Sequence, residues 1–246
     1  MFSPDLIAKY PSLAKYANGD YTESHDGREA ALLKYIYNHP SLPQLRNSPP
    51  AILAVIDEFA AQQDFLINIG SDKAVKLCDI IAKEQPSVFV ELGGYIGYSA
   101  ICFGHAMRQT SKPGQDVKLL SLEFDPAIAD IATNLIDLAG LSDIVTVVVG
   151  SAADSLRKLH SEGVLNHVDF LFLDHVEDLY LSDFQVCESL GLLRSGALVV
   201  ADNILRPGAP QYREFMRGYP KVESWAIKGL IIPGELEDEL ELSRIK

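Results

Sequence analysis

The stretch that most constrains the fold is 88–99, which reads V-F-V-E-L-G-G-Y-I-G-Y-S. Its first three residues are β-branched or aromatic and Glu91 follows them, which predicts a buried parallel strand that ends in an acid. Gly93, Gly94 and Gly97 come next, and residues without a Cβ allow tight turns, positive φ and the close approach of a ligand to the backbone. A strand, an acid and a glycine-rich turn into a helix together predict a nucleotide-cofactor site.

The position of this acid predicts the charge of the ligand. The glycine spacing is not the G-x-G-x-x-G of dinucleotide folds, in which the helix N-terminus after the loop meets a pyrophosphate. A carboxylate at the end of the strand repels phosphate and attracts a cation, and S-adenosylmethionine carries an ammonium and a sulfonium group. The alternative is a structural turn in some other α/β domain, because a glycine loop alone is a weak signal.

Length, charge and cysteine content narrow the class of protein. A chain of 246 residues fits a single α/β domain. Its net charge of −13 argues against a broad surface for nucleic acid or anionic membrane. The three separated cysteines fit neither a disulfide framework nor a C-x-x-C metal site, and no apolar run reaches the ~18 residues of a membrane span. We therefore expect a cytoplasmic protein with reduced cysteines and no nucleic-acid or membrane partner.

Strands alternate with helices along most of the chain. Residues 1–27 are polar and broken by proline and glycine, which predicts a loosely held N-terminal extension. Residues 28–85 have the periodicity of three helices, which we expect to form a helical cap. Five strands with helices between them then predict an α/β fold with a Rossmann-like, doubly wound, mostly parallel sheet, in one domain over 28–246. The expected helices of the cap are 28–38, 51–63 and 72–84, and the expected strands are 88–91, 118–124, 144–149, 168–173 and 197–201.

Two further segments near the C-terminus have a strand pattern. The first is 222–227, which contains Trp225. In the second, 235–242, acidic residues alternate with Leu236, Leu240 and Leu242, which is typical of an amphipathic edge strand. We expect the acidic residues of this strand to form a solvated face.

Acidic and amide side chains follow the ends of the predicted parallel strands. Glu123 closes the second strand, where an acid can accept both hydroxyls of a ribose; the alternative is an acid that faces solvent. Asp174 closes the fourth strand, and Asp202 and Asn203 follow the fifth. Two carboxylates and an amide oxygen suit Mg²⁺, and the alternative is that they cap loops and a helix.

Four segments, in this order along the chain, resemble those of the catechol O-methyltransferase family. They are V-E-L-G-G-Y-I-G-Y-S, L-S-L-E-F-D-P, F-L-F-L-D-H-V-E-D-L-Y-L and G-L-L-R-S-G-A-L-V-V-A-D-N-I-L-R-P-G-A-P. The lead-in N-I-G-S-D-K at 68–73 is similar too, and the likeness extends from about residue 28 to residue 218. It implies the class I methyltransferase fold, S-adenosylmethionine and Mg²⁺ as cofactors, and methyl transfer to a hydroxyl of a catechol-type, phenolic small molecule.

The resemblance also assigns roles to single residues. It implies that Glu91 and Ser99 lie near the amino acid part of S-adenosylmethionine, that Glu123 binds the ribose and that Asp174, Asp202 and Asn203 bind magnesium. The complete set expected at the cofactor is Ile69, Glu91, Gly93, Tyr95, Ser99, Glu123, Phe124, Ala152, Asp174 and His175. The expected catalytic residues are Glu177 and Asp174, and the expected substrate contacts are Asn203, Glu177 and Pro207.

The chain departs from the family pattern on the acceptor side. Three residues after the metal aspartate the family has a lysine that acts as the general base, and this chain has Glu177. The family has a glutamate that fixes the second catechol hydroxyl; it should fall near Ile231 or Ile232, where this chain has no glutamate. The family tryptophan after the histidine is replaced here by Val176. The Ser-Gln pair beside the adenine is a pair of alanines at 152–153. We expect Glu177 to accept the proton in place of the lysine.

These departures leave two alternatives open. One is an O-methyltransferase that acts on another small hydroxylated metabolite, and the other is a catalytically impaired relative that binds S-adenosylmethionine and has a regulatory role. The protein is expected to be a monomer or a weak homodimer. The expected wall of the acceptor site is Phe65, Ile67, Tyr95, Pro207 and the stretch 231–233.

Overall fold

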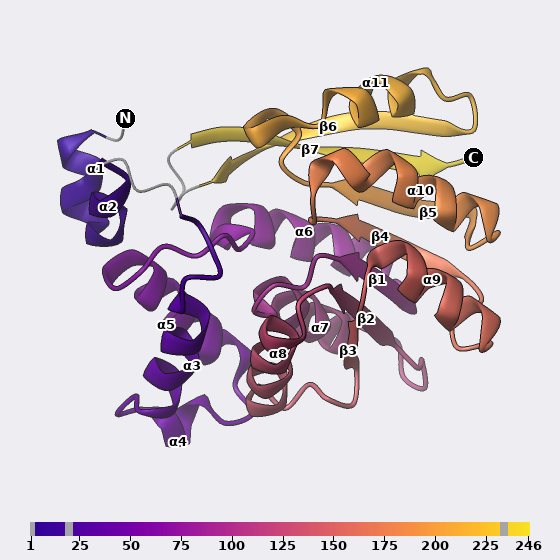
Figure 1. The fold of residues 1–246 in the computed structure, drawn as a ribbon. Coiled ribbons are helices and arrows are strands. Elements are labelled where there is room, and N and C mark those ends of the chain that lie inside the picture. Colours follow the sequence, from indigo (N-terminus) through magenta and orange to yellow (C-terminus); the bar gives the residue numbers. More distant parts are fainter. Residues whose placement is uncertain (1–2, 18–21, 232–235) are drawn as a thin grey trace.

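One seven-stranded sheet runs through the protein (Figure 1). The computed structural model describes residues 3–17, 22–231 and 236–246. The strand order is β3-β2-β1-β4-β5-β7-β6, and β1 to β5 pair in parallel, whereas β7 is antiparallel to both of its neighbours. The predicted doubly wound, mostly parallel sheet is thus confirmed. The strands are β1 (Val88–Leu92), β2 (Lys118–Glu123), β3 (Val145–Val149), β4 (Val168–Leu173), β5 (Leu193–Ala201), β6 (Val222–Ile231) and β7 (Leu236–Ile245).

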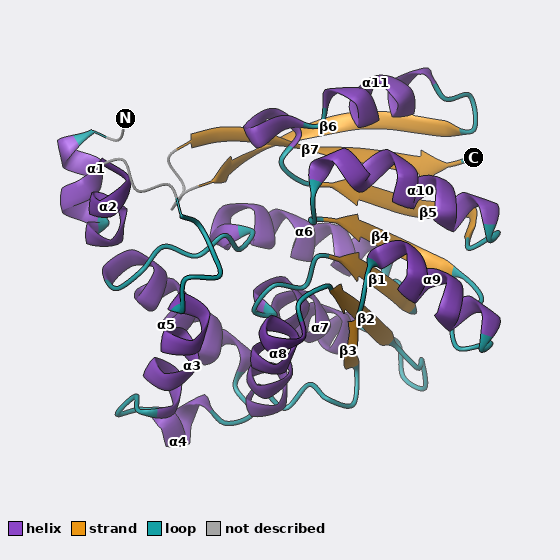
Figure 2. Ribbon diagram, in the orientation of Figure 1, coloured by secondary structure: helices purple, strands orange, loops and turns teal. Residues whose placement is uncertain are grey.

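Helices cover both faces of this sheet (Figure 2). Because successive side chains of a strand point to opposite faces, each strand contributes to two apolar cores. On one face Phe89 and Phe170 stack with their ring centroids 4.6 Å apart, under α6 and α7. On the other, Val90 and Leu171 pack with residues of α9, α10 and α11. The longer helices are α3 (Arg28–Tyr37), α5 (Pro49–Gln62), α6 (Gly70–Glu84), α7 (Tyr98–Thr110), α8 (Pro126–Leu138), α9 (Ala152–Ser161), α10 (Tyr180–Ser189) and α11 (Pro210–Gly218).

The first described segment of the N-terminal extension, 3–17, is held more closely than its composition predicts. It forms α1 (Pro4–Lys9), the 3₁₀ turn Pro11–Leu13 and α2 (Ala14–Ala17). Leu13 is fully buried against Phe65, and the Ser12 hydroxyl donates to the Ala60 carbonyl of α5 at 2.5 Å. A single leucine with an apolar partner far along the chain is enough to dock a segment that its polar neighbours leave undefined.

The loop predicted between the first two cap helices contains a further short helix, α4 (Leu42–Leu45). The three cysteines are free thiols. Within the described ranges, none of the helices combines the length and the apolar character needed to cross a membrane.

The prediction of a solvated C-terminal edge strand is wrong. β7 lies between β5 and β6, so β6 is the edge of the sheet. Asp238 and Glu241 of β7 are buried, and Arg217 of α11 donates to Glu241 at 2.8 and 3.0 Å. Alternation of charge and leucine predicts a strand, but it does not reveal that α11 covers the charged face.

The order of the strands reverses between β1 and β4. The chain proceeds from β1 outward to β2 and β3, and from β4 outward in the other direction to β5. In such sheets the crevice at the carboxyl ends of the two central strands is where ligands bind. Gly93 lies there with a φ of +95°, and a Cβ on it would overlap the carbonyl oxygen of Asp174. The glycine therefore lets the loop after β1 press against the end of β4.

Candidate active site

Glu91 lies at the end of β1, completely enclosed. One of its oxygens, Oε2, accepts a hydrogen bond from the Ser121 hydroxyl at 2.5 Å, while within the described ranges Oε1 is buried without a partner. Burial raises the pKa of this carboxyl to about 7; the hydroxyls of Ser121 and of the nearby Ser99 oppose the shift, and the charge of Glu123 adds to it. A buried acid with an unused oxygen beside a glycine loop suits a cationic ligand group.

Glu123, at the end of β2, organises the loop that follows β1. Its two carboxylate oxygens accept the backbone N–H groups of Tyr95 at 2.7 Å and of Asp125 at 2.8 Å. Tyr95 has a φ of +42°, and its hydroxyl donates to Glu29 of α3 at 2.9 Å. Glu123 is therefore partly buried and hydrogen-bonded rather than a solvent-facing acid, and each of its oxygens keeps a lone pair for a ribose hydroxyl.

Asp174 and Asp202 follow β4 and β5 directly. They lie beside each other because Leu173 pairs with Ala201, and the Asp202 N–H donates to the Leu173 carbonyl at 2.9 Å. Burial raises the pKa of both carboxyls; the charge of Asp202 raises that of Asp174 further, whereas Lys73 opposes the shift in both. Two adjacent acids that repel each other, one of them buried and the other partly buried, favour a bound cation.

Asn203 completes the predicted magnesium ligands. It has a φ of +55°, and its side-chain amide donates to the Arg206 carbonyl at 2.9 Å, so its Oδ1 atom remains available as a ligand. The residues present fit a hard cation as two carboxylates and one amide oxygen. Over the described ranges, no three side chains of the His, Cys, Asp and Glu types gather into a metal-binding group.

His175 and Glu177 follow Asp174 at the same edge of the sheet. His175 Nε2 forms a hydrogen bond with Asp183 of α10 at 2.8 Å, and its Nδ1 atom is buried without a partner among the described residues. Glu177 is half-buried, and burial raises the pKa of its carboxyl, although the charge of His175 opposes this. A carboxylate with a raised pKa is a better proton acceptor than an exposed one.

The remaining predicted residues lie at or near the same edge. Ile69 and Ser99 are buried at the starts of α6 and α7, and Ala152 begins α9. Phe124 directly follows Glu123 and is 77% exposed. Pro207 is exposed in the turn Ile204–Gly208. Of the expected acceptor wall, Phe65 is buried and Ile67 is 42% exposed, whereas 232–233 lie outside the described residues.

Two buried charges beside the predicted magnesium ligands were missed from the sequence. Lys73 of α6 is fully buried and donates to Asp202 and to Asp238 of β7. Both residues left a signal in the sequence. Lys73 is in phase with the buried Leu77 and Ile81 of its helix, and Asp238 with the leucines of β7. A charge on the apolar side of an element indicates a buried partner.

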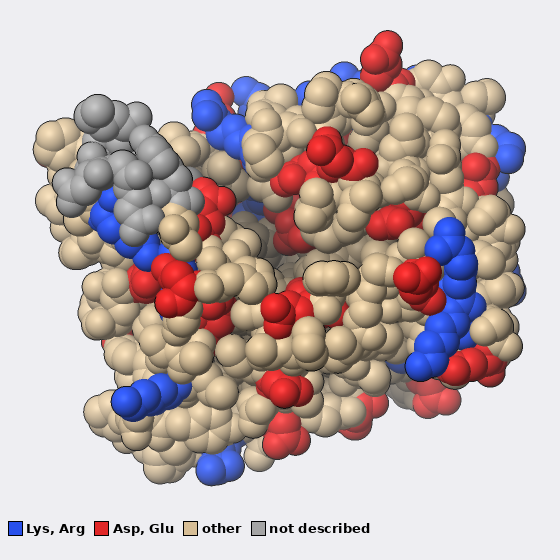
Figure 3. All heavy atoms as spheres, viewed as in Figure 1, with Lys and Arg blue, Asp and Glu red and all other residues tan. Residues whose placement is uncertain are grey.

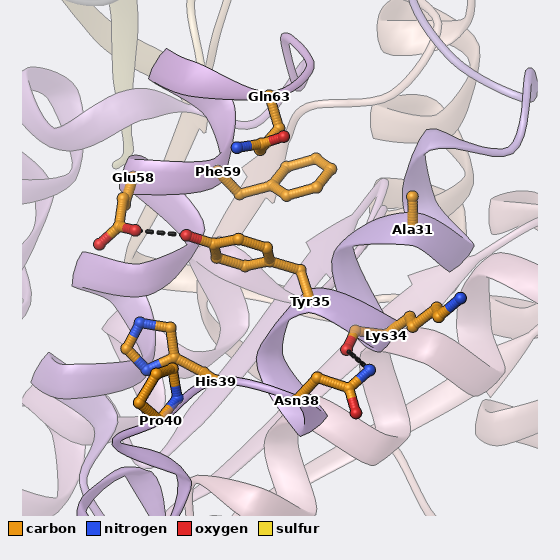
Figure 4. A pocket seen from close by; sticks show the side chains of 9 residues that line it. All are labelled: Ala31, Lys34, Tyr35, Asn38, His39, Pro40, Glu58, Phe59 and Gln63. Atoms are coloured by element: carbon orange, nitrogen blue, oxygen red, sulfur yellow. Dashed lines mark hydrogen bonds between the residues drawn. The ribbon is translucent and has the colours of Figure 1, made fainter.

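The surface at the carboxyl ends of the strands is hollowed, with acidic side chains at its margin (Figure 3). A separate cavity of about 600 Å³ lies between α3 and α5, on the cap (Figure 4). There the Tyr35 hydroxyl donates to Glu58, and Asn38 donates to the Lys34 carbonyl at 2.8 Å. None of the residues that line this cavity belongs to the predicted site, so the strand ends remain the candidate active site.

Comparison with known proteins assigns the family. A family model described as O-methyltransferase matches residues 48–214. Catechol O-methyltransferase of Bos taurus is 33% identical over 214 residues, which cover 87% of this chain and 75% of that protein. The chain belongs to the O-methyltransferase family. A probable O-methyltransferase of Mycobacterium tuberculosis is 35% identical, over 78% of this chain and 79% of that protein.

Solved structures agree with this assignment in their fold. An O-methyltransferase from Bacillus cereus in complex with SAH has a TM-score of 0.64 at 20% identity, over 98% of this chain and 100% of that one. The O-methyltransferase TomG from Streptomyces achromogenes, in complex with SAM, also has a TM-score of 0.64, at 19% identity and over 100% of both chains. The protein is thus an S-adenosylmethionine-dependent O-methyltransferase in family and in fold, and the predicted family resemblance is confirmed.

Proposed function

We propose that this methyltransferase acts on a hydroxyl of a catechol-type small molecule with Mg²⁺ bound by Asp174, Asp202 and Asn203. The observation that carries the proposal is the pair of adjacent acids at the ends of β4 and β5, Asp202 buried and Asp174 partly buried, directly beside the glycine loop. A divalent ion there would relieve the repulsion between the two carboxylates and offer open positions to the two adjacent oxygens of a catechol. The relatives named catechol O-methyltransferase support the same acceptor class.

The contribution of the chain to catalysis is mainly positioning. Methyl transfer is a displacement in which the oxygen, the methyl carbon and the sulfur lie nearly in line, so the geometry of binding supplies most of the rate. Glu91 and Glu123 would hold the cofactor from the ends of β1 and β2, and His175, which forms a hydrogen bond with Asp183, would lie beside it. Bound magnesium lowers the pKa of a hydroxyl that ligates it.

Glu177 would then take the proton of the acceptor hydroxyl. A phenolic hydroxyl has a pKa of about 10, far above that of an ordinary carboxyl. Burial raises the pKa of Glu177 and so narrows this difference. Even so, a carboxylate is a weaker base than a desolvated lysine, so we expect slower turnover or a preference for more acidic acceptors. This same residue favours the second candidate, an O-methyltransferase for another small hydroxylated metabolite.

The test compares Glu177→Gln, Glu177→Lys and the exposed neighbour Asp178→Asn on catechol and nitrocatechol, with Mg²⁺ or with EDTA. We expect Glu177→Gln to lower kcat by about 100-fold on catechol and less on the more acidic nitrocatechol. Glu177→Lys should turn over catechol at least as fast as the parent protein, and Asp178→Asn should match the parent. EDTA should abolish the activity of the parent and of all three variants.

Three results would contradict parts of this proposal. Unchanged rates in both Glu177 variants, with any accepted catechol, would exclude Glu177 as the base. Full activity in EDTA would exclude the divalent ion. Binding of S-adenosylmethionine without product over a panel of catechols would favour the non-catalytic, regulatory alternative.

A further inference from the structure

Lys73 is a fully buried cation beside the predicted magnesium ligands. Its Nζ atom donates to Asp202 and, at 2.7 Å, to Asp238 Oδ2, and both carboxylates are themselves almost completely buried. Burying an ammonium group costs several kcal/mol of desolvation free energy unless its partners compensate. Lysines are rarely buried completely unless they are paired, and this one is paired with two acids.

The surrounding chain is built to admit the Lys73 side chain. Gly229 of β6 lies against its stem, and a Cβ on this glycine would be 2.7 Å from Lys73 Cγ and 3.2 Å from Cε. The neighbouring Asp72 accepts the Leu230 N–H at 2.9 Å, which fixes the start of α6 against β6. The position of the ammonium group is therefore defined from both sides, by its acceptors and by the strand along its stem.

Asp238 connects this lysine to the turn after β5. Its second oxygen, Oδ1, accepts the backbone N–H groups of Leu205 at 2.8 Å and of Arg206 at 3.2 Å. The turn Ile204–Gly208 begins directly after Asn203 and contains Pro207. One ammonium group thus joins α6, the end of β5 and β7, and through Asp238 it anchors the turn that follows the magnesium ligands.

The hydrogen bonds of Asp202 define which of its oxygens faces the ion. Oδ1 accepts both the Lys73 ammonium group and the Asn203 N–H, the latter at 2.7 Å. Within the described ranges, Oδ2 accepts no hydrogen bond. With Oδ1 occupied, the carboxylate cannot rotate without breaking two bonds.

We propose that Lys73 is a positioning residue for the divalent ion: it holds Asp202 by Oδ1 so that Oδ2 is presented to the metal. This inference rests on the proposed magnesium site and adds to it a residue that does not touch the ion. Groups that orient metal ligands typically change the metal affinity about 10-fold to 100-fold when they are removed.

Charge and positioning predict opposite effects for the loss of Lys73. Replacing it by methionine removes one positive charge from beside the ion site. If charge alone mattered, the more negative site would bind a divalent cation more tightly. If Lys73 positions Asp202, the variant should bind the cation more weakly in spite of its more negative site.

The experiment measures the affinity for Mn²⁺, from the electron paramagnetic resonance signal of the free ion, in the presence of S-adenosylhomocysteine. We expect Lys73→Met to weaken Mn²⁺ binding about 10-fold or more. Lys83→Met removes the same charge from an exposed position in the last turn of the same helix, and it should bind Mn²⁺ like the parent protein. Binding of S-adenosylhomocysteine, measured by calorimetry, reports whether each variant is folded.

A second variant keeps every charge in place. Gly229→Ala adds a methyl group against the stem of Lys73 and displaces its ammonium group, so it should also weaken Mn²⁺ binding, and it decides the question if Lys73→Met does not fold. Unchanged or tighter Mn²⁺ binding in either folded variant would overturn the positioning role of Lys73 but would leave the proposed ion site standing. Failure of the parent protein itself to bind Mn²⁺ would overturn the proposed ion site, and the positioning role with it.

Discussion

At the scale of single residues, burial decides how Glu91 behaves. A strand-end acid with an ordinary pKa would be charged at neutral pH, whereas burial raises the pKa of Glu91 to about 7. Near neutral pH about half of the folded, unliganded molecules then hold a proton at Glu91 that the unfolded chain has released. A cationic ligand group near its free Oε1 atom would favour the charged form and displace that proton.

This residue makes the stability of the unliganded protein depend on pH. Between pH 4.5, the ordinary pKa of a glutamate, and pH 7, the folded state binds more protons at Glu91, so its contribution falls as pH rises. Replacing Glu91 by Gln removes this dependence. The stability of the variant relative to the parent should increase by up to about 3 kcal/mol from pH 4.5 to pH 8. Urea unfolding at both pH values measures the difference.

The control for Glu91→Gln is Glu162→Gln, which changes an exposed acid at the end of α9. The stability of this control relative to the parent should be the same at pH 4.5 and pH 8. The same Glu91→Gln variant should bind S-adenosylmethionine more weakly, since it lacks the charge that faces the cation. A constant stability difference between pH 4.5 and pH 8 would show that Glu91 is charged in the unliganded protein.

At the scale of elements, β7 carries buried charge on both of its sides. Asp238 faces Lys73 of α6, and Glu241 faces the arginines of α11. Arg217 donates to both Glu241 oxygens, and the Nε atom of Arg213 lies 3.3 Å from Glu241 Oε2. A strand with such partners on both sides can lie inside a sheet, where uncompensated carboxylates would be too costly.

We expect Glu241→Gln to destabilise the protein by about 2 kcal/mol, because it removes a charge-assisted hydrogen bond from a fully buried side chain. The free energy of unfolding in urea measures the effect. Glu237→Gln, at an exposed position of the same strand, should change the stability by less than about 0.5 kcal/mol. Equal effects of the two substitutions would mean that the pairing with α11 contributes little.

At the scale of the whole molecule, the net charge of −13 and the acidic margin of the hollowed face act on any charged ligand (Figure 3). S-adenosylmethionine has one net positive charge, and S-adenosylhomocysteine, which lacks the sulfonium group, has none. The surrounding field therefore favours the methyl donor over the product. Salt weakens this preference, since it screens charges beyond about 10 Å at 0.1 M.

We expect the affinity for S-adenosylmethionine to fall roughly twofold to fivefold when the salt concentration rises from 0.01 to 0.15 M. The affinity for S-adenosylhomocysteine, measured by calorimetry in the same buffers, should change much less. An equal dependence for the two ligands would indicate that only groups in direct contact with the ligand determine its binding.

The features of the fold and the site that can be predicted from the sequence are those that depend on residues close together in the chain. Gly93 has a left-handed φ, which a glycine loop after a buried strand predicts, whereas its closeness to the Asp174 carbonyl is found only in the folded structure. Asp174 and Asp202 meet because parallel strands end at one edge, which the order of the elements already implies. The docking of 3–17 was not predictable, because it depends on Leu13 reaching Phe65 across a long separation in the chain.

The sequence by itself determined the order of the strands and helices along the chain, the glycine loop and the acids at the strand ends, since each depends on neighbouring residues. Only the tertiary structure decided that β7 enters the sheet between β5 and β6, and that Lys73 meets acids 129 and 165 residues away. The physical reason is that the free energy of a buried charge depends on partners brought together by folding. Periodicity along the chain carries no record of which partners those are.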